Sequence, residues 1–253
     1  MLDDGDASVS SAEAGPTWSD IARWYEDLIV AGSGPHETAT NCLLGLVPAL
    51  DGAEVLDLGC GQGLAVRALA RAGAKRVTGI DLSEAMIELA RAHGYVNGCD
   101  VSYAVGDAQH LAPLGNATFD GVTCQLALMD FPDLDASLAE VHRVLRPGGW
   151  FVFIIGHPCF LVPDAVREER EDGRPALSVC GYFQERFWRS SNPSGVRRAG
   201  TYHRTLSTYL NALLRAHFSL EEVAEPIATG LLARQQPAFA EVPIFFCARA
   251  RRR

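Results

Sequence analysis

The sequence lacks the features of a secreted, zinc-binding or membrane-embedded protein. Its seven cysteines are scattered, and none forms a CxxC pair, so no disulfide framework or metal site is indicated and a reducing compartment is expected. No apolar run reaches 18 residues, and the N-terminal "MLDDGDASVSSAEAG" is acidic where a signal peptide begins with a basic segment. These absences predict a soluble cytoplasmic protein that binds neither a metal nor a membrane.

Positive charge is also scarce. The chain has 22 Lys and Arg against 31 Asp and Glu, a formal net charge of −9. A protein that neutralises several phosphates normally presents a basic face, so nucleic acid is not expected as a partner. The basic "RARRR" at the C-terminus is interpreted as a solvated tail.

Short apolar runs alternate with helical patterns through the first part of the chain. Strands are predicted at 54–59, 76–81, 101–106, 119–125 and 150–155, and the intervening helices at 63–72, 83–93 and 134–145. Strands separated by helices of about ten residues imply right-handed crossovers and a mainly parallel sheet that is covered on both faces. The predicted fold class is therefore a doubly wound α/β fold.

The pattern divides the chain into four segments. Residues 1–16 are predicted to be a disordered acidic lead-in, and 17–156 to hold two N-terminal helices (18–30 and 36–49) and the α/β core. Residues 157–204 show no period and are predicted to be an inserted cap, with its charged run 167–174 facing solvent. Residues 205–253 return to the core with a helix (206–218) and two strands within 220–226 and 243–250.

A glycine-rich turn follows the first strand in "VLDLGCGQG" (55–63). Gly59, Gly61 and Gly63 have no Cβ, so the turn can bend tightly and its backbone can approach a ligand. Asp81 ends the second strand, where a carboxylate can accept both hydroxyl hydrogens of a ribose, and Asp107 follows the third strand, where it can accept from an adenine amine. Together these positions predict an adenosine site.

The same residues carry a resemblance to a known family. "EVLDLGCGQG", "TGIDLSEAMIELAR", "VGDAQHLAP", "FDGVTCQLALMDFPD" and "HRVLRPGGWFVF" follow one another in the order and at the spacing of the class I S-adenosylmethionine-dependent methyltransferases of small molecules. The resemblance covers about residues 53–155. It implies a Rossmann-like sheet of seven strands ending in an antiparallel pair, with the cap inserted after the fifth strand, and S-adenosyl-L-methionine as the cofactor.

The resemblance also assigns roles to individual residues. It places the turn Gly59, Cys60, Gly61 and Gly63 at the methionine and ribose part of the cofactor, with Asp57 at the ammonium end. At the ends of the second and third strands it places Asp81 at the ribose hydroxyls, Leu82 on the adenine face, and Asp107 and Ala108 at the adenine edge. It places Gln125 at the methionine backbone and Tyr25 in the helix that folds over the cofactor. Each glycine or aspartate alone could be an ordinary turn or cap residue, and Tyr25 an ordinary core aromatic.

The acceptor is expected to bind in the inserted segment. Methyl transfer is an in-line displacement that depends on alignment, and a phenol acceptor gains from a positioned base. His157 follows the fifth strand and His203 precedes the C-terminal helix, so both are candidate catalytic residues, although each could instead bond local backbone groups. Five aromatic residues are expected to line a pocket for an organic molecule: Phe160, Tyr182, Phe183, Phe187 and Trp188.

Several interpretations stay open at this level. The leading one is methyl transfer to oxygen or nitrogen of a small organic acceptor, a specialised metabolite, with carbon not excluded. The alternatives are a methyltransferase of RNA, DNA or protein, a nicotinamide-dependent oxidoreductase with a similar sheet, and an inactive cofactor-binding scaffold. "CQLA" after the fourth strand differs from the [DNS]-P-P-[YF] segment of enzymes that methylate base amines. Homo-oligomerisation is compatible with the sequence and is not decided by it.

Overall fold

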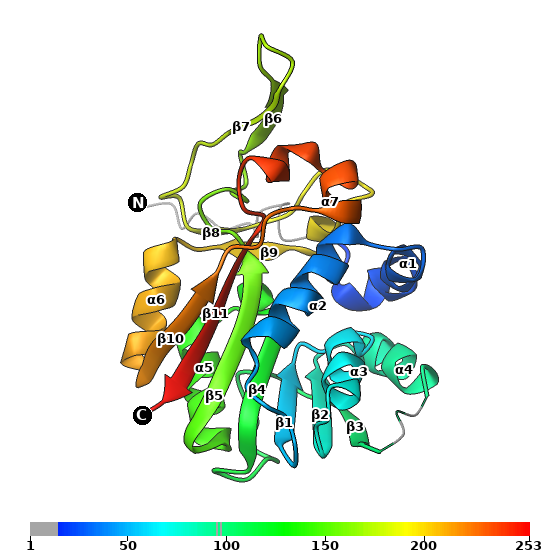
Figure 1. Cartoon of the computed structure of the whole chain (residues 1–253), viewed down its shortest axis with the longest axis vertical. Coiled ribbons are helices and arrows are strands. Elements are labelled where there is room, and N and C mark those ends of the chain that lie inside the picture. Colours follow the sequence, from blue (N-terminus) through cyan, green and yellow to red (C-terminus); the bar gives the residue numbers. More distant parts are fainter. Residues whose placement is uncertain (1–14, 95, 97) are drawn as a thin grey trace, which may run out of the picture.

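A seven-stranded sheet forms the centre of the protein. In the computed structural model, which describes residues 15–94, 96 and 98–253, the strand order is β10-β11-β5-β4-β1-β2-β3 (Figure 1). Strands β1 to β5 are parallel, β11 is antiparallel to β5, and β10 is antiparallel to β11. This confirms the predicted fold class. Most of the predicted acidic lead-in lies outside the described residues.

The elements of the core match the sequence pattern closely. The five parallel strands are β1 (Glu54–Leu58), β2 (Arg76–Asp81), β3 (Asp100–Val105), β4 (Phe119–Gln125) and β5 (Leu145–Gly156). The helices between and after them are α3 (Leu64–Arg71), α4 (Glu84–Ala92), α5 (Leu134–Val144) and α6 (Leu206–Arg215). The sheet ends with β10 (Phe218–Ala224) and β11 (Phe245–Arg252), which are the two predicted closing strands.

Burial on both faces explains the nearly continuous apolar run of the central strand β5. In β5, Phe151 and Phe153 pack into one core cluster with α5 and α6, while the alternating Val152 and Ile154 pack into the other with α2 (Gly34–Leu46) and α3. Successive strand residues point to opposite faces, so a strand covered on both sides needs apolar residues at every position. Among the described residues, no helix is both long and apolar enough to cross a membrane.

Several element boundaries differ from the prediction by a few residues, and two of these differences have a clear cause. Strand β5 begins at Leu145, immediately after α5, and so includes the "RPGG" that the sequence predicted as the break before a shorter strand. Leu145 pairs with Phe119 before an irregularity in the β4–β5 register, which explains how this segment joins the sheet. The second N-terminal helix, α2, ends at Leu46 because Val47 is extended before Pro48.

The segment after β5 contains structure that its lack of period concealed. It forms two hairpins, β6 (Val166–Glu169) with β7 (Pro175–Ser178), and β8 (Arg186–Trp188) with β9 (Thr201–His203), with a short 3-10 helix η2 (Val196–Ala199) between β8 and β9. The β6–β7 hairpin projects from the body of the molecule (Figure 1), and residues 167–174 are exposed as expected. Helix α7 (Gly230–Gln235) and the 3-10 helix η3 (Pro237–Ala240), which precede β11, were not predicted.

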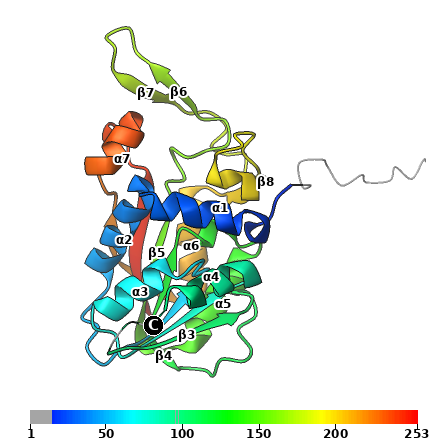
Figure 2. The same cartoon turned by 90° about the vertical axis from the view of Figure 1, so that its right-hand side faces the viewer.

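Helix α1 (Trp18–Val30) lies across the edge of the sheet where the parallel strands end (Figure 2). It is held to α4 by the Ser19 and Ser83 hydroxyls, 2.8 Å apart, and by His93 Nε2, 2.6 Å from Glu26 Oε1. The Arg198 guanidinium of η2 lies 4.0 Å from the centre of the Trp24 ring on its other side. Helix α1 therefore connects the α/β core with the inserted segment directly above the strand ends.

Candidate active site

A pocket of about 350 Å³ opens at the point where the strand order reverses, between β1 and β4. In open α/β sheets this crevice is the usual ligand site. Six of the eleven predicted cofactor residues line it: Tyr25, Asp57, Gly59, Cys60, Gly61 and Gln125. Ile29, His36, Gln62, Leu64 and Ala65 complete the wall and were not predicted. The sequence therefore located the pocket but not its whole lining.

The glycines after β1 are required for different reasons. Gly59 has φ +64°, and a Cβ there would lie 2.3 Å from Ala127 Cβ. Gly61 has φ +51°, and a Cβ there would meet nothing within 4 Å, although Gly61 lines the pocket. Gly59 thus permits close packing of the turn, whereas the space beside Gly61 is left open for a ligand. Gly63 (φ +82°) precedes α3 and would clash with Tyr103.

A buried carboxylate and an unpaired amide oxygen face the same pocket. Asp57 Oδ1 accepts a hydrogen bond of 2.6 Å from the Thr123 hydroxyl, and burial raises the pKa of Asp57 to about 7. Gln125 donates Nε2 to Thr40 Oγ1 at 3.1 Å, but its buried Oε1 has no hydrogen-bond partner within the described part of the chain. A buried carboxyl group and an amide oxygen that lacks a donor therefore lie in the wall of one pocket.

Asp81 connects the glycine turn with the end of β2. Its Oδ2 accepts from the Gly61 amide at 2.8 Å and its Oδ1 from the Ser83 amide at 2.9 Å. Burial raises the pKa of Asp81, and these two hydrogen bonds oppose that effect. Leu82, the next residue, is 73 % exposed, an arrangement open to a flat apolar group. Asp81 does not line the 350 Å³ pocket itself, but it holds the turn that does.

Asp107 and Ala108 lie in the turn after β3. Asp107 Oδ1 accepts from the backbone amide of Gln109 at 2.9 Å, and Ala108 is buried. Neither residue lines the pocket. Their predicted contact with adenine stays a prediction.

Helix α1 brings Tyr25 into the pocket, where it meets a histidine that the sequence analysis missed. The Tyr25 hydroxyl lies 2.6 Å from His36 Nε2, and His36 Nδ1 lies 2.6 Å from the Ser33 hydroxyl. Burial lowers the pKa of His36 to about 4, so its ring is neutral near pH 7. Burial, followed by the carboxylates of Asp130 and Asp81, raises the pKa of Tyr25. Helical spacing alone could not show that α2 would place a histidine against this tyrosine.

A second pocket of about 270 Å³ lies between the end of β5 and the inserted segment. It is lined by Met129, Gly156, Pro158, Leu161, Trp188, Arg197, Thr201, Tyr202, His203, Arg204 and Tyr209. Of the five aromatic residues expected here, only Trp188 lines the pocket. The expectation for Phe183 is wrong, because this side chain is 85 % exposed. The other aromatic walls are Tyr202 and Tyr209, from β9 and α6.

Asp130 lies close to Arg197, which lines the second pocket. It ends the 3-10 helix η1 (Leu128–Asp130) that follows β4. Its Oδ1 is 3.9 Å from Arg197 Nη1, and this buried oxygen has no hydrogen-bond partner among the described residues. Burial raises the pKa of Asp130 to about 6, and Arg197 opposes the shift. Asp130 also acts electrostatically on Tyr25 of the first pocket. Asp133, three residues later, is the N-cap of α5.

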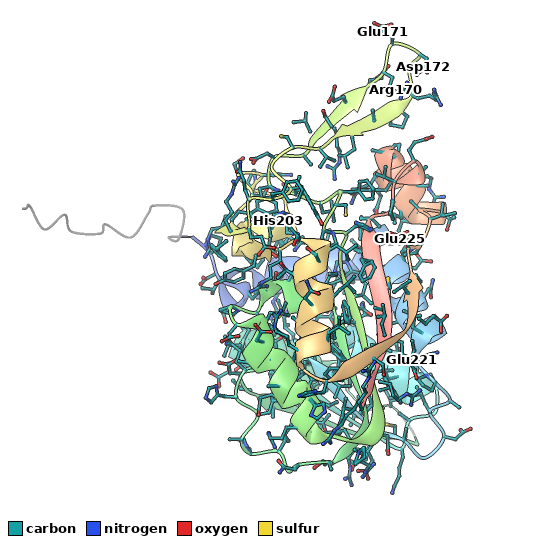
Figure 3. All side chains as sticks on the ribbon, turned by 90° about the vertical axis from the view of Figure 1, so that its left-hand side faces the viewer. Arg170, Glu171, Asp172, His203, Glu221 and Glu225 are labelled. Atoms are coloured by element: carbon teal, nitrogen blue, oxygen red, sulfur yellow. The ribbon has the colours of Figure 1, made fainter. Side chains whose placement is uncertain are left out.

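The two candidate histidines have different surroundings. His157 is buried, its Nδ1 accepts from the Cys159 amide at 3.2 Å, and its Nε2 lies 2.7 Å from Glu225 Oε1. His203 lines the second pocket, and its Nε2 donates to the Tyr182 carbonyl at 2.7 Å, which leaves Nδ1 as its acceptor nitrogen. Figure 3 shows His203 next to the start of α6 and Glu225 near α7, while Arg170, Glu171 and Asp172 mark the distant hairpin tip.

The cysteines give no further site. All seven lie in the described part of the chain and are free thiols, and Cys60, Cys124 and Cys247 are buried as expected of small core residues. Within the described residues, no group of three or more His, Cys, Asp or Glu side chains is arranged to hold a metal ion.

Comparison with known proteins shows that the chain is similar to methyltransferases. The Methyltransferase domain family matches residues 56–153. The ubiquinone biosynthesis O-methyltransferase of Thiobacillus denitrificans is 42 % identical over 104 residues, which are 41 % of this chain and 44 % of that protein. The matched region thus spans less than half of this relative. An uncharacterized protein of Haemophilus influenzae is 31 % identical over 191 residues, 73 % of this chain and 74 % of its own length.

A solved structure extends the similarity to most of the chain. The S-adenosylmethionine-dependent methyltransferase from Mesorhizobium loti is 31 % identical, with a TM-score of 0.71, and the match covers 88 % of this chain and all of that one. The likeness therefore includes the α/β core and most of the segments around it. The chain belongs to the class I S-adenosylmethionine-dependent methyltransferases.

Proposed function

We propose that this enzyme transfers the methyl group of S-adenosylmethionine to a hydroxyl oxygen of a small organic acceptor. The observation that carries the proposal is the buried, unpaired Oδ1 of Asp130 beside Arg197 of the second pocket, in a protein whose first pocket lies at the strand switch point. The relatives named as O-methyltransferases favour oxygen over nitrogen. A specialised metabolite as acceptor, and the absence of nucleic acid and protein substrates, stay predictions.

The residues of the first pocket fit the cofactor. The ammonium and sulfonium groups of the cofactor are cationic. The pocket offers the Asp57 carboxylate and the unpaired Gln125 Oε1 to the ammonium group. The open space beside Gly61 leaves room for the ligand against the turn. We assign the ribose hydroxyls to Asp81, the adenine face to Leu82, and the adenine edge to Asp107 and Ala108, as the family pattern implies. Tyr25 of α1 lines the same pocket.

The site residues also account for the proton. S-adenosylmethionine, when bound, supplies a methyl carbon whose bond to sulfur breaks, with the electron pair left on sulfur, as the acceptor oxygen bonds to the carbon. We assign the hydroxyl proton to Asp130, because its buried Oδ1 is unpaired beside Arg197 of the second pocket and its pKa of about 6 leaves it ionised near neutral pH. Arg197, 3.9 Å away, stabilises the carboxylate before the transfer.

The test is a methyl-transfer assay with a methyl-labelled cofactor. A panel of small acceptors is offered in pairs that differ only in bearing a hydroxyl or an amine on the same carbon skeleton. The proposal predicts labelled ether products, formed one for one with S-adenosylhomocysteine. Label found only on amines, or only on added RNA or protein, would contradict it.

Cofactor affinity is expected to depend on pH through Asp57. The carboxyl must ionise to bind the ammonium group, so with a pKa of about 7 in the free protein the affinity rises with pH through that value. Below pH 7, Asp57 must lose a proton when the cofactor binds. The cofactor therefore binds about 20-fold more weakly at pH 5.5 than at pH 7.5. Titration calorimetry in two buffers of different ionisation enthalpy measures both the affinity and the proton released.

Asp57→Asn is the matched variant, because it keeps the shape and removes the titration. It should bind the cofactor weakly with a flatter pH dependence. Because the folded pKa of Asp57 lies above its unfolded value of 3.8, stability from this group is lost as pH rises toward 7. The ligand-free variant should therefore melt above the wild type at pH 8, with the difference shrinking toward pH 4. Unchanged proton release in the variant would reject the assignment.

Alanine variants of the two candidate histidines are expected to affect different properties of the enzyme. Both ring nitrogens of His157 have partners, so His157→Ala should mainly lower Tm, by about 5 °C for a lost buried hydrogen bond. His203→Ala should raise KM for the acceptor with a smaller effect on kcat, because His203 lines the acceptor pocket. If His203→Ala instead lowers kcat and abolishes the fall in rate at acidic pH, the base is His203 and not Asp130.

A further inference from the structure

The acceptor pocket contains a buried guanidinium that lacks an anion. Arg204 is only 9 % exposed, and its Nη2 donates to the carbonyl oxygens of Phe131 and Pro132, both at 2.7 Å. Its Nη1 is buried and has no hydrogen-bond partner in the described part of the chain. No described carboxylate forms an ion pair with it. A buried charge held only by neutral groups favours binding of an anion.

A second arginine borders the same pocket and is placed by a glycine. Arg197 Nη1 donates to the Thr201 hydroxyl at 3.1 Å, and it lies 3.9 Å from Asp130 Oδ1. The other terminal nitrogen, Nη2, would be 2.7 Å from a Cβ at Gly156, the last residue of β5. The guanidinium therefore packs against bare backbone. This position links the pocket to Asp130 and makes the pocket cationic on two sides.

The pocket also has aromatic walls, and it is small. Trp188, Tyr202 and Tyr209 line it, and the Arg204 Cζ lies 4.7 Å from the centre of the Tyr202 ring. Burial raises the pKa of Tyr209 to about 12, so its hydroxyl stays neutral and does not repel an anion. The open space among these residues is about 270 Å³. The pocket thus suits one ring with an anionic group.

We propose that the acceptor is a small aromatic carboxylate whose carboxylate binds Arg204. A guanidinium recognises a planar carboxylate through paired N–H groups, and Nη1 is the donor still available. The ring lies between the aromatic walls, and the hydroxyl to be methylated points toward Asp130 and the first pocket. The inference rests on the proposed function and names the chemical class of its acceptor.

Binding of simple probes tests the inference without methyl transfer. With S-adenosylhomocysteine saturating the first pocket, benzoate, benzamide and inorganic phosphate are titrated into the full chain. Benzoate should bind at least about 10-fold more tightly than neutral benzamide, since charge-assisted hydrogen bonds are about twice as strong as neutral ones, and more tightly than phosphate. Equal binding of benzoate and benzamide, or tighter binding of phosphate, would overturn the proposal.

Variants locate the site. Arg204→Gln should lose benzoate binding at least about 10-fold while keeping the affinity for S-adenosylhomocysteine, and Arg215→Gln, an exposed arginine on α6, should change neither. If Arg204→Gln does not fold, Arg204→Lys gives a second reading, because lysine keeps the positive charge but lacks the paired N–H groups that recognise a carboxylate. Retention of full benzoate affinity in the folded variant would contradict the assignment.

The outcomes separate this inference from the function it rests on. Methyl transfer to neutral hydroxyl compounds together with no benzoate binding would leave O-methylation standing and reject the aromatic carboxylate. Benzoate binding that depends on Arg204, in a protein that methylates no hydroxyl, would support the anion site and reject the proposed reaction.

Discussion

Replacing Gly61 with leucine is expected to weaken S-adenosylmethionine binding by about 100-fold, the equivalent of about 3 kcal/mol of overpacking. The reason is steric. A Cβ at Gly61 meets no protein atom within 4 Å, and Gly61 lines the pocket between β1 and β4, so the added side chain enters space that the cofactor needs. Titration calorimetry with S-adenosylhomocysteine measures the loss.

Gly94 provides the matched control for backbone strain. It also has a positive φ (+76°) and open space around its missing Cβ, but it lies on the surface after α4, away from both pockets. Each leucine variant forces a side chain into the left-handed region at about 1–2 kcal/mol, so both should lower Tm by a similar few degrees. Equal cofactor affinity in the two variants would show that the pocket beside Gly61 is not the cofactor site.

Replacing Asp130 with asparagine is expected to lower kcat by about 100-fold or more, the usual contribution of a positioned base. Asparagine keeps the size of the side chain, so cofactor affinity should stay within about threefold. In the wild type, Asp130 must be ionised to accept the proton, and its pKa is about 6. The rate should therefore fall as pH drops below 6 and level off above 7. Steady-state kinetics across pH in both proteins gives the comparison.

Asp133→Asn is the control for Asp130→Asn. Asp133 is three residues away, and its Oδ1 accepts from the Ala136 amide as the N-cap of α5. Its replacement should change kcat little, because it touches neither pocket and asparagine is also a good N-cap. A comparable loss of kcat in both variants, or an unchanged acidic limb in Asp130→Asn, would mean that Asp130 does not accept the proton.

The sequence predicted the core well because its local and long-range signals agree. Strands buried on both faces must be apolar at nearly every position, and the parallel arrangement brings their carboxyl ends to one edge. The places of Asp57, the glycine turn and Asp81 follow from that arrangement alone. Their distances and their pKa shifts do not, because these depend on how the helices cover the sheet.

The acceptor side could not be predicted in the same way. Arg197 and Arg204 lie in or just after a segment without period, and only folding brings them to η1 and the end of β5. Phe183 is an aromatic residue of the type that lines ligand pockets, yet its position in the segment leaves its side chain in solvent. The role proposed for Asp130 could not be predicted, because an aspartate shortly before a helix is usually an N-cap. In the structure only Asp133 is the N-cap.

The most direct test of the account is a crystal structure of the protein with S-adenosylhomocysteine. The account predicts the ammonium group at Asp57 and Gln125, the ribose hydroxyls at Asp81, and the open side of the sulfur facing Asp130 and the pocket that holds Arg197. A product bound with its sulfur turned away from Asp130, or bound outside the pocket between β1 and β4, would contradict it.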